Sequence, residues 1–335
     1  MISTLHRRTV LAAGLALAAA HRPRAAEAET LVLYNGQHRT TTEALVAAFT
    51  KETGTAVTVR NAESPALAGQ LIEEGARTPA DLFYSEQSPP VAALEERGLL
   101  LPLEAETLKQ VPAAYASRTG VWVGGSVRTR VVAYNKAMLT PDKLPRSVLD
   151  FATPAWKDRI GYAPKDGFQE QIMAIERLKG HDAALAWLRG LRENGRMYNG
   201  NGAAVRAMEA GEVAAVLTNN YYWYSLARER GADAMKSAVH YVDRTDVGAI
   251  QCLSAAGILK SSAKPALAQR FVAFMVGAAG QTAIAGSVAE YPVRPGVASP
   301  FALPPLDQVA AAPVTPAEFG SAAEAYAMQR DAGMA

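Results

Sequence analysis

Short apolar runs alternate with helical patterns along the first part of the chain that follows residue 29. Three runs are short, rich in branched or aromatic residues and bounded by turn residues, which is typical of buried strands: 30–34, 56–59 and 81–84. Apolar residues recur at helical spacing in the segments between and after them: 43–49, 64–72 and a stretch opened by Pro89-Pro90. This alternation predicts a mostly parallel sheet with helices on both faces.

The pattern changes near residue 121. Two strand-like runs lie close together in the sequence, 121–125 and 130–134, and we expect them to pass between two lobes as a hinge. The segment 143–156 is predicted to be loop. A second α/β unit follows, with strands predicted at 159–162 and 213–217 and helices at 169–179, at 182–192 and in a segment that ends at Gly211. Strands at 238–242 and 248–253 are predicted to return the chain to the first lobe. Helices are predicted at 265–276 and, at the end of the chain, 315–329.

These elements predict an α/β protein with two lobes, and a length of 335 residues allows two domains. We expect the first lobe to comprise residues 29–129 plus 252–302, and the second to comprise 130–251 plus 303–335. Ligand sites in such sheets lie beyond the carboxyl ends of the strands. The cleft between the lobes is therefore where we expect the chemistry of the protein.

The first 28 residues have the pattern of a bacterial export signal. Arg7 and Arg8 precede an apolar run at 10–20, which is too short to span a bilayer, and a small-residue cleavage site follows at Ala26-Glu27-Ala28. We expect this segment to be removed and the product to be a soluble periplasmic monomer. The arginine pair suits the twin-arginine route as well as an ordinary signal.

Charge and motifs exclude several classes of function. Removal of four arginines and one glutamate with the signal leaves 30 basic and 31 acidic side chains, which argues against nucleic acid as a partner. The single cysteine, Cys252, lies in a strand-like run and is expected to be a buried, inert thiol. The sequence contains no His-Glu-x-x-His run and no Gly-x-Ser-x-Gly elbow, so we do not expect an enzyme.

Chemically useful side chains follow three of the predicted strands. His38 comes after the first strand, Glu86 after the third, and Tyr221 and Tyr222 after the run 213–217. Asn219 or Asn220 is a good helix cap, so the two tyrosines would lie in a first helical turn, about 100° apart, where their hydroxyl groups can converge. Taken singly, each residue has a simpler interpretation: His38 as a solvated loop residue, Glu86 as a carboxylate at the start of a helix, and the tyrosines as the aromatic face of a core helix.

Together the four residues predict a site for a hard cation, because they offer oxygen donors and one imidazole without a thiolate. A phenol, with an ordinary pKa of about 10, ionises only beside a strong Lewis acid. Glu86 and two phenolates supply three negative charges, which neutralise Fe³⁺ when His38 is neutral. Iron(III) fits this set best, and four ligands leave two octahedral positions for water or a small anion.

The chain resembles the bacterial periplasmic ferric-iron-binding proteins, the transferrin-like receptors of iron(III) ABC importers, over its whole mature length. The resemblance is carried by the runs 34–38, 84–87, 159–162, 219–224, 290–292 and 332–334. It implies a class II periplasmic binding protein with two hinge-linked lobes. It also implies that His38, Glu86, Tyr221 and Tyr222 ligate iron, and that an inner-membrane permease and its ATPase receive the ion.

The same resemblance implies a synergistic anion, phosphate or carbonate, unless water completes the site. Gln87, Asn201 and Asn219 match residues that hold phosphate in that family. The neighbouring loop departs from the family pattern, because it reads Lys165-Asp166-Gly167 where phosphate-binding members carry Ser-Gly-Ala. Lys165 would attract an anion, whereas Asp166 would repel one or itself approach the metal, and a solvated turn is the remaining interpretation.

The expected mechanism begins with iron on Tyr221 and Tyr222 of the second lobe. Lobe closure then brings His38 and Glu86 onto the ion, and protonation of the ligands at low pH releases it. An alternative keeps the fold and binds a small organic ligand, such as a polyamine or thiamine, among the aromatic side chains. An exported metalloenzyme using His38 and Glu86 is the least favoured interpretation.

Overall fold

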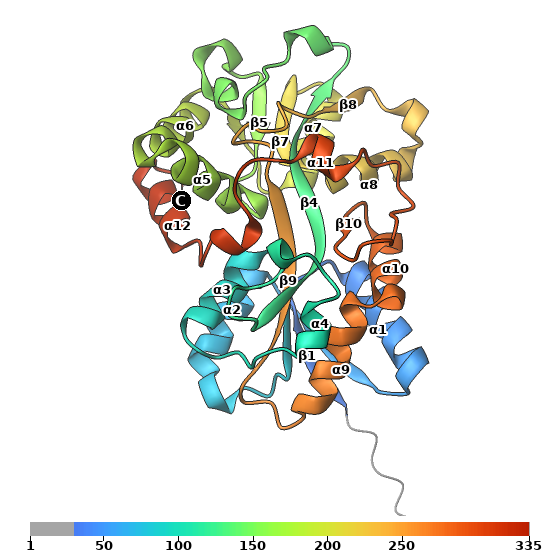
Figure 1. Cartoon of the computed structure of the whole chain (residues 1–335). Helices are drawn as coiled ribbons and strands as arrows, with labels where there is room; N and C mark the ends of the chain where they lie inside the picture. The colour runs from blue at the N-terminus through green and yellow to red at the C-terminus, as the bar shows by residue number, and fades with distance from the viewer. Residues whose placement is uncertain (1–29, 335) are drawn as a thin grey trace, which may run out of the picture.

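The computed structural model describes residues 30–334 and shows two lobes stacked along one axis (Figure 1). The predicted export signal at 1–28 lies outside the described residues. Ten strands form one continuous mixed sheet, in which the main order is β2-β1-β3-β9-β4-β7-β5-β6. Their bounds are β1 (Leu31–Asn35), β2 (Val57–Asn61), β3 (Leu82–Ser85), β4 (Trp122–Asn135), β5 (Ile160–Tyr162), β6 (Arg196–Met197), β7 (Ala215–Asn219), β8 (Ser237–His240), β9 (Gln251–Ile258) and β10 (Tyr291–Pro292).

Strand β4 runs through both lobes. Its first half, Trp122–Thr129, pairs with β9, and β10 pairs with Ser126 and Val127 of the same half. Its second half, from Arg130 onward, pairs with β7 and β8. The sequence predicted two strands here, and that prediction was wrong: the glycine pair Gly124-Gly125 is absorbed by a shift in the pairing with β9 instead of ending the strand.

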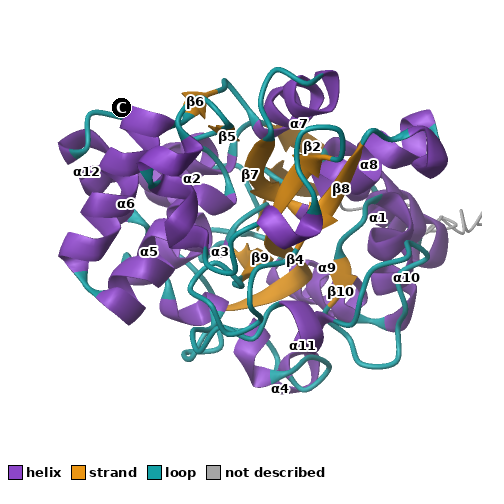
Figure 2. Ribbon diagram, turned by 90° about the horizontal axis from the view of Figure 1, so that it is seen from above, coloured by secondary structure: helices purple, strands orange, loops and turns teal. Residues whose placement is uncertain are grey.

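The helices cover both faces of the sheet in each lobe (Figures 1 and 2). Those of the lower lobe in Figure 1 are α1 (Arg39–Thr53), α2 (Ser64–Glu74), α3 (Ser88–Glu96), α4 (Ala105–Leu108), α9 (Pro265–Val276) and α10 (Ala278–Ser287). The others are α5 (Gly167–Lys179), α6 (His181–Asn194), α7 (Asn201–Ala210), α8 (Asn220–Arg230), α11 (Leu306–Val309) and α12 (Ala323–Asp331). Short 3-10 helices occupy Gly75–Arg77, Ala113–Tyr115, Pro141–Lys143, Val148–Ala152, Pro154–Trp156, Ala232–Ala234 and Pro316–Glu318.

Each lobe has its own apolar core. In the first, Phe49 of α1 packs edge-to-face on Phe271 of α9, with ring centroids 5.0 Å apart, beneath the buried strands β1 and β3. In the second, Phe168 of α5 stacks on Trp187 of α6, with centroids 5.3 Å apart. Two separate cores joined by a continuous strand confirm the predicted two-lobed α/β fold. The exact residue bounds of the lobes stay a prediction.

The end of the chain differs from the helix predicted at 315–329. A 3-10 turn, Pro316–Glu318, is followed by Gly320 and Ala322, which have φ angles of 61° and 56°. Because this backbone region is incompatible with an α-helix, α12 begins only at Ala323 and packs on α5 and α6. Among residues 30–334, no helix has the length and apolarity that a membrane crossing requires.

Candidate functional site between the lobes

His38 lies at the carboxyl end of β1, directly before α1. The turn that carries it is held by Asn35, whose side chain accepts hydrogen bonds from the Gln37 backbone N–H at 3.1 Å and the Thr42 hydroxyl at 2.7 Å. Gly36 is needed in this turn, since a Cβ there would lie 2.2 Å from Ser64 Oγ. The sequence thus fixes the imidazole at the edge of the sheet.

Glu86 follows β3, the neighbouring parallel strand, and is buried. Its backbone N–H donates to Ser64 Oγ at 3.0 Å, and the Ser64 hydroxyl in turn donates to the Gly36 carbonyl at 3.2 Å. Burial, reinforced by the charge of Asp166, raises the pKa of Glu86 to about 7 despite the opposing charges of His38 and Arg128. One serine therefore ties the His38 turn to the Glu86 turn.

Tyr221 and Tyr222 lie in the first turn of α8, directly after β7, as the sequence predicted. Their ring centroids are 4.2 Å apart, and the His38 ring meets Tyr221 edge-on at 4.7 Å. The capping prediction was half right: Asn219 occupies the N-cap position without a side-chain cap bond. Its Oδ1 instead accepts from Arg130 at 3.0 Å, and Asn220 Oδ1 accepts from the Thr129 backbone N–H at 2.9 Å.

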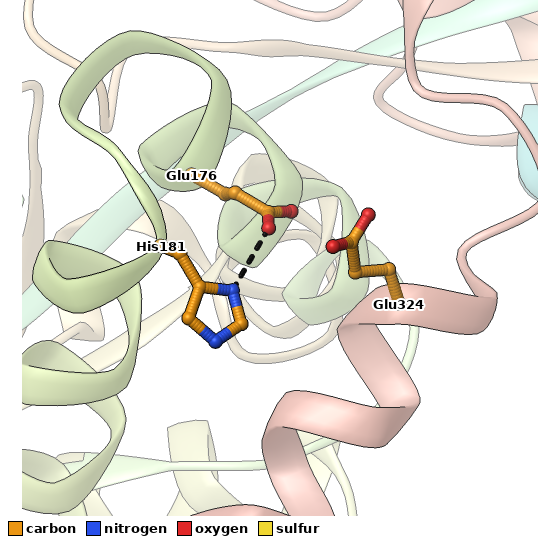
Figure 3. A group of neighbouring side chains, drawn as sticks. All are labelled: Glu176, His181 and Glu324. Atoms are coloured by element: carbon orange, nitrogen blue, oxygen red, sulfur yellow. Dashed lines mark hydrogen bonds and ion pairs between the residues drawn. The ribbon is translucent and has the colours of Figure 1, made fainter.

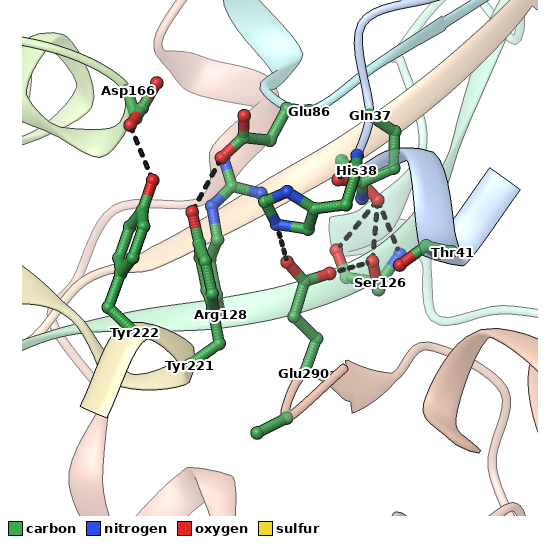
Figure 4. Close-up of polar contacts among 12 residues, drawn as sticks. Gln37, His38, Thr41, Glu86, Ser126, Arg128, Asp166, Tyr221, Tyr222 and Glu290 are labelled. Carbon is green, nitrogen blue, oxygen red and sulfur yellow. Dashed lines mark hydrogen bonds and ion pairs between the residues drawn. The ribbon is translucent and has the colours of Figure 1, made fainter. Parts of the chain in front are cut away.

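The four predicted metal ligands come together across the interlobe cleft (Figure 4). The Tyr221 hydroxyl donates to Glu86 Oε1 at 2.9 Å, which joins α8 of one lobe to the β3–α3 turn of the other. Burial raises the pKa of Tyr221 well above 10, and burial with the charge of Asp166 raises the pKa of Tyr222 as well. Both phenols therefore carry their protons at neutral pH in the absence of a cation.

Five of the six predicted anion-site residues lie around one carboxylate or beside it. Asp166 accepts hydrogen bonds from Tyr222, Asn201 and Gln87. Gly167 packs against Asn219, because a Cβ at Gly167 would lie 2.8 Å from Asn219 Oδ1. Lys165, in contrast, is exposed to solvent.

This arrangement presents one imidazole, two carboxylates and two phenols within one cleft. Neighbouring donors around an octahedral ion with bonds of about 2.0–2.1 Å lie about 2.9 Å apart. The Tyr221–Glu86 and Tyr222–Asp166 contacts, at 2.9 and 3.0 Å, have that separation. The cluster is therefore a candidate centre for a hard, highly charged cation.

The comparisons with known proteins agree with this geometry. Residues 44–317 match the family model described as bacterial extracellular solute-binding protein. The chain is 44% identical over 310 residues to the major ferric iron-binding protein of Neisseria meningitidis, covering 91% of this chain and 93% of that one. The Fe(3+)-binding periplasmic protein of Serratia marcescens is 36% identical, with 96% and 95% covered.

A solved structure is similar in fold as well as in sequence. Iron-bound HitA from Pseudomonas aeruginosa superposes with a TM-score of 0.88 at 45% identity, covering 91% of this chain and 99% of that chain. The chain belongs to the bacterial extracellular solute-binding proteins. Within that family it falls among relatives of the ferric-iron-binding type, as the sequence resemblance implied.

Two buried carboxylates of this solute-binding protein, Glu290 and Glu170, were not predicted as site residues, whereas Arg128 was a weaker candidate for anion contact. Glu290, directly before β10, lies 3.4 Å from His38 Nε2 and accepts a hydrogen bond from Ser126 Oγ. Burial works against the His38 imidazolium, but Glu290 and the charge of Glu86 outweigh it and raise the pKa of His38. Arg128 and Glu170 form a fully buried ion pair at 3.7 Å behind the cleft. The run 290–292 carries part of the family resemblance, but a two-residue strand has no periodicity that would place Glu290 beside His38.

A second cluster of ligand-type side chains lies on the surface of α5, α6 and α12 (Figure 3). His181 Nδ1 lies 3.1 Å from Glu176 Oε1, with Glu324 nearby, and both His181 and Glu324 are exposed. This group lacks a phenol and lies apart from the cleft, and its contact is that of an ordinary surface pair. The interlobe cluster remains the candidate site.

A cavity of about 260 Å³ opens beside Asp166, between α2, α3 and α12. Its lining is mainly apolar and includes Ile72, Pro89 and Tyr326. The two phenols do not line it, and its volume falls below the range of about 300–1,000 Å³ that is usual for sites of small organic ligands. The cavity therefore gives no specific support to a polyamine or thiamine as the ligand.

Proposed function

We propose that this protein is a periplasmic receptor that binds Fe³⁺ through His38, Glu86, Tyr221 and Tyr222 and delivers it to an inner-membrane ABC permease and its ATPase. The observation that carries the proposal is the gathering of two adjacent phenols and two carboxylates, in which Tyr221 is hydrogen-bonded to Glu86 across the cleft and Tyr222 to Asp166 of its own lobe. The Neisseria and Serratia relatives, both ferric-iron-binding proteins, and the iron bound in HitA support the choice of ion.

The lobes supply different parts of the proposed site. Tyr221 and Tyr222 come from α8, and we infer that iron meets them first. Closure about β4, with a lobe boundary between Thr129 and Arg130, then brings His38 and Glu86 onto the ion. The change of pairing partners of β4 at this point supports the boundary. Iron leaves when the ligands regain their protons or the permease separates the lobes.

The test is spectroscopic. Iron-free protein titrated with ferric citrate should develop a visible tyrosinate-to-iron charge-transfer band. Tyr221→Phe and Tyr222→Phe should each weaken the band and lower the affinity, whereas Tyr224→Phe, a partly exposed tyrosine of the same helix, should leave both unchanged. A titration that stays colourless, or unchanged iron binding in the Tyr221→Phe and Tyr222→Phe variants, would contradict the proposal. Calorimetry of the iron-free protein with spermidine and thiamine checks the organic-ligand alternative.

A further inference from the structure

Asp166 has an unusual backbone conformation for its residue type. It lies between β5 and α5 with φ 58° and ψ −129°, a region that L-residues rarely adopt outside glycine. Strained residues of this kind persist where the surrounding structure holds them, and they cluster at ligand sites. Figure 4 shows the carboxylate directed at the Tyr222 hydroxyl.

Three donors from both lobes converge on this carboxylate. Tyr222 and Asn201 reach Oδ2, each at 3.0 Å, and Gln87 Nε2 reaches Oδ1 at 3.4 Å from the opposite lobe. The three neutral donors bind both oxygens of the Asp166 carboxylate. A free oxyanion bound in the same place would need the same kind of donors. Here the oxyanion is part of the chain.

The position also suits direct contact with the metal. The Tyr222–Asp166 separation of 3.0 Å nearly equals the 2.9 Å between Tyr221 and Glu86, and the two phenol rings are neighbours with centroids 4.2 Å apart. The carboxylate therefore lies directly beside one of the proposed ligands. A second anion at this position would meet the like charge of the half-buried Asp166, which is unfavourable. The neighbouring Lys165 side chain is exposed to solvent, where its charge is screened.

We propose that the Asp166 carboxylate is the built-in anion of the iron site, which takes the place next to Tyr222 and makes tight iron binding independent of free phosphate or carbonate. The inference rests on the proposed function and specifies how its site is completed. On this proposal, the 165–167 loop differs from the family pattern because the protein supplies the anion itself, as the Asp166 side chain, instead of binding a free one.

The experiment compares iron affinity, by competition with citrate, in buffer freed of phosphate and carbonate and in buffer with added phosphate. The wild-type affinity and charge-transfer band should be the same in both. Asp166→Gly relieves the backbone strain and removes the carboxylate. It should bind iron at least about tenfold more weakly without phosphate and regain affinity when phosphate is added. Asp166→Asn keeps the size of the side chain but removes its charge. This variant should bind iron more weakly than the wild type while remaining folded.

Asp158→Gly is the matched control, because Asp158 is an exposed aspartate of the same lobe with a φ of 59°. Its iron affinity should equal the wild type in both buffers. Thermal unfolding of the iron-free Asp166 variants should show a midpoint no lower than the wild type. Wild-type binding that requires phosphate, or an Asp166→Gly variant with wild-type affinity in the anion-free buffer, overturns the inference. Absence of any coloured complex in the wild type overturns the proposed function instead.

Discussion

At the scale of single residues, the protonated phenols set the pH dependence of the proposed iron binding. The pKa values of Tyr221 and Tyr222 are raised above 10 by burial, so both hydroxyl groups hold protons at pH 7 and donate them to carboxylates. A ferric ion bound by two phenolates must displace both protons. Glu86, whose pKa is raised to about 7, adds a third proton as the pH falls below that value.

We therefore predict that iron binding weakens as the pH falls. Where Glu86 and His38 are already deprotonated, two released protons correspond to a loss of about 100-fold in affinity per pH unit. The loss becomes steeper at lower pH, where Glu86 and His38, whose pKa values are both raised, take up protons as well. Calorimetry in two buffers of different ionisation enthalpy counts the protons directly. Tyr222→Phe should release one proton fewer than the wild type, and Tyr224→Phe the same number. Equal proton release in all three proteins would contradict the assignment of the phenols.

At the scale of elements, two turns that follow neighbouring parallel strands carry half of the site, and Ser64 locks them together. Its hydroxyl accepts from the Glu86 N–H and donates to the Gly36 carbonyl. The contact depends on the absence of a side chain at Gly36, where a Cβ would also lie 2.7 Å from Ser64 Cα. This distance involves backbone, so the clash is relieved only by moving one turn.

Gly36→Ala is predicted to lower the free energy of unfolding by about 1–3 kcal/mol and to weaken iron binding, because His38 moves with its turn. Urea unfolding and the citrate competition measure the two effects. Gly69→Ala is the matched control: Gly69 lies within α2, a Cβ added there would meet no atom within 4 Å, and the variant should lose neither stability nor affinity. Wild-type values for both properties in Gly36→Ala would show that the turns are not coupled in this way.

The same elements explain what the sequence could predict. Local pattern places His38 and Glu86 at one edge, because the carboxyl ends of the parallel strands β1 and β3 share it. The tyrosines follow β7, which runs antiparallel to those strands, so they approach the site from the opposite lobe. The role of Asp166 was left open between three interpretations, since a positive φ at an aspartate has no sequence signature. Glu290 reaches His38 through the antiparallel pairing of β10 with β4, a contact between residues far apart in the chain that no local periodicity encodes.

At the scale of the whole molecule, the site is also the contact between the lobes. Glu86 and Gln87 belong to one side of the cleft, and Tyr221 and Asp166 to the other, so the hydrogen bonds at 2.9 and 3.4 Å bridge it. Both bonds join a neutral donor to a carboxylate, and each stabilises the contact between the lobes by on the order of 1–3 kcal/mol at most. A trivalent ion bound by both sides would hold the lobes together far more strongly than they do alone.

Iron is accordingly predicted to make the molecule both more compact and more stable. Small-angle X-ray scattering should give a smaller radius of gyration for the iron-loaded than for the iron-free protein. Ferric ion at about 100 times its dissociation constant adds about 2.7 kcal/mol, which raises the midpoint of thermal unfolding by several degrees. In the double variant Glu86→Gln/His38→Gln, iron should still colour the tyrosines but leave the radius unchanged, because the donors of the first lobe are lost. Compaction in that variant equal to the wild type would contradict closure through His38 and Glu86.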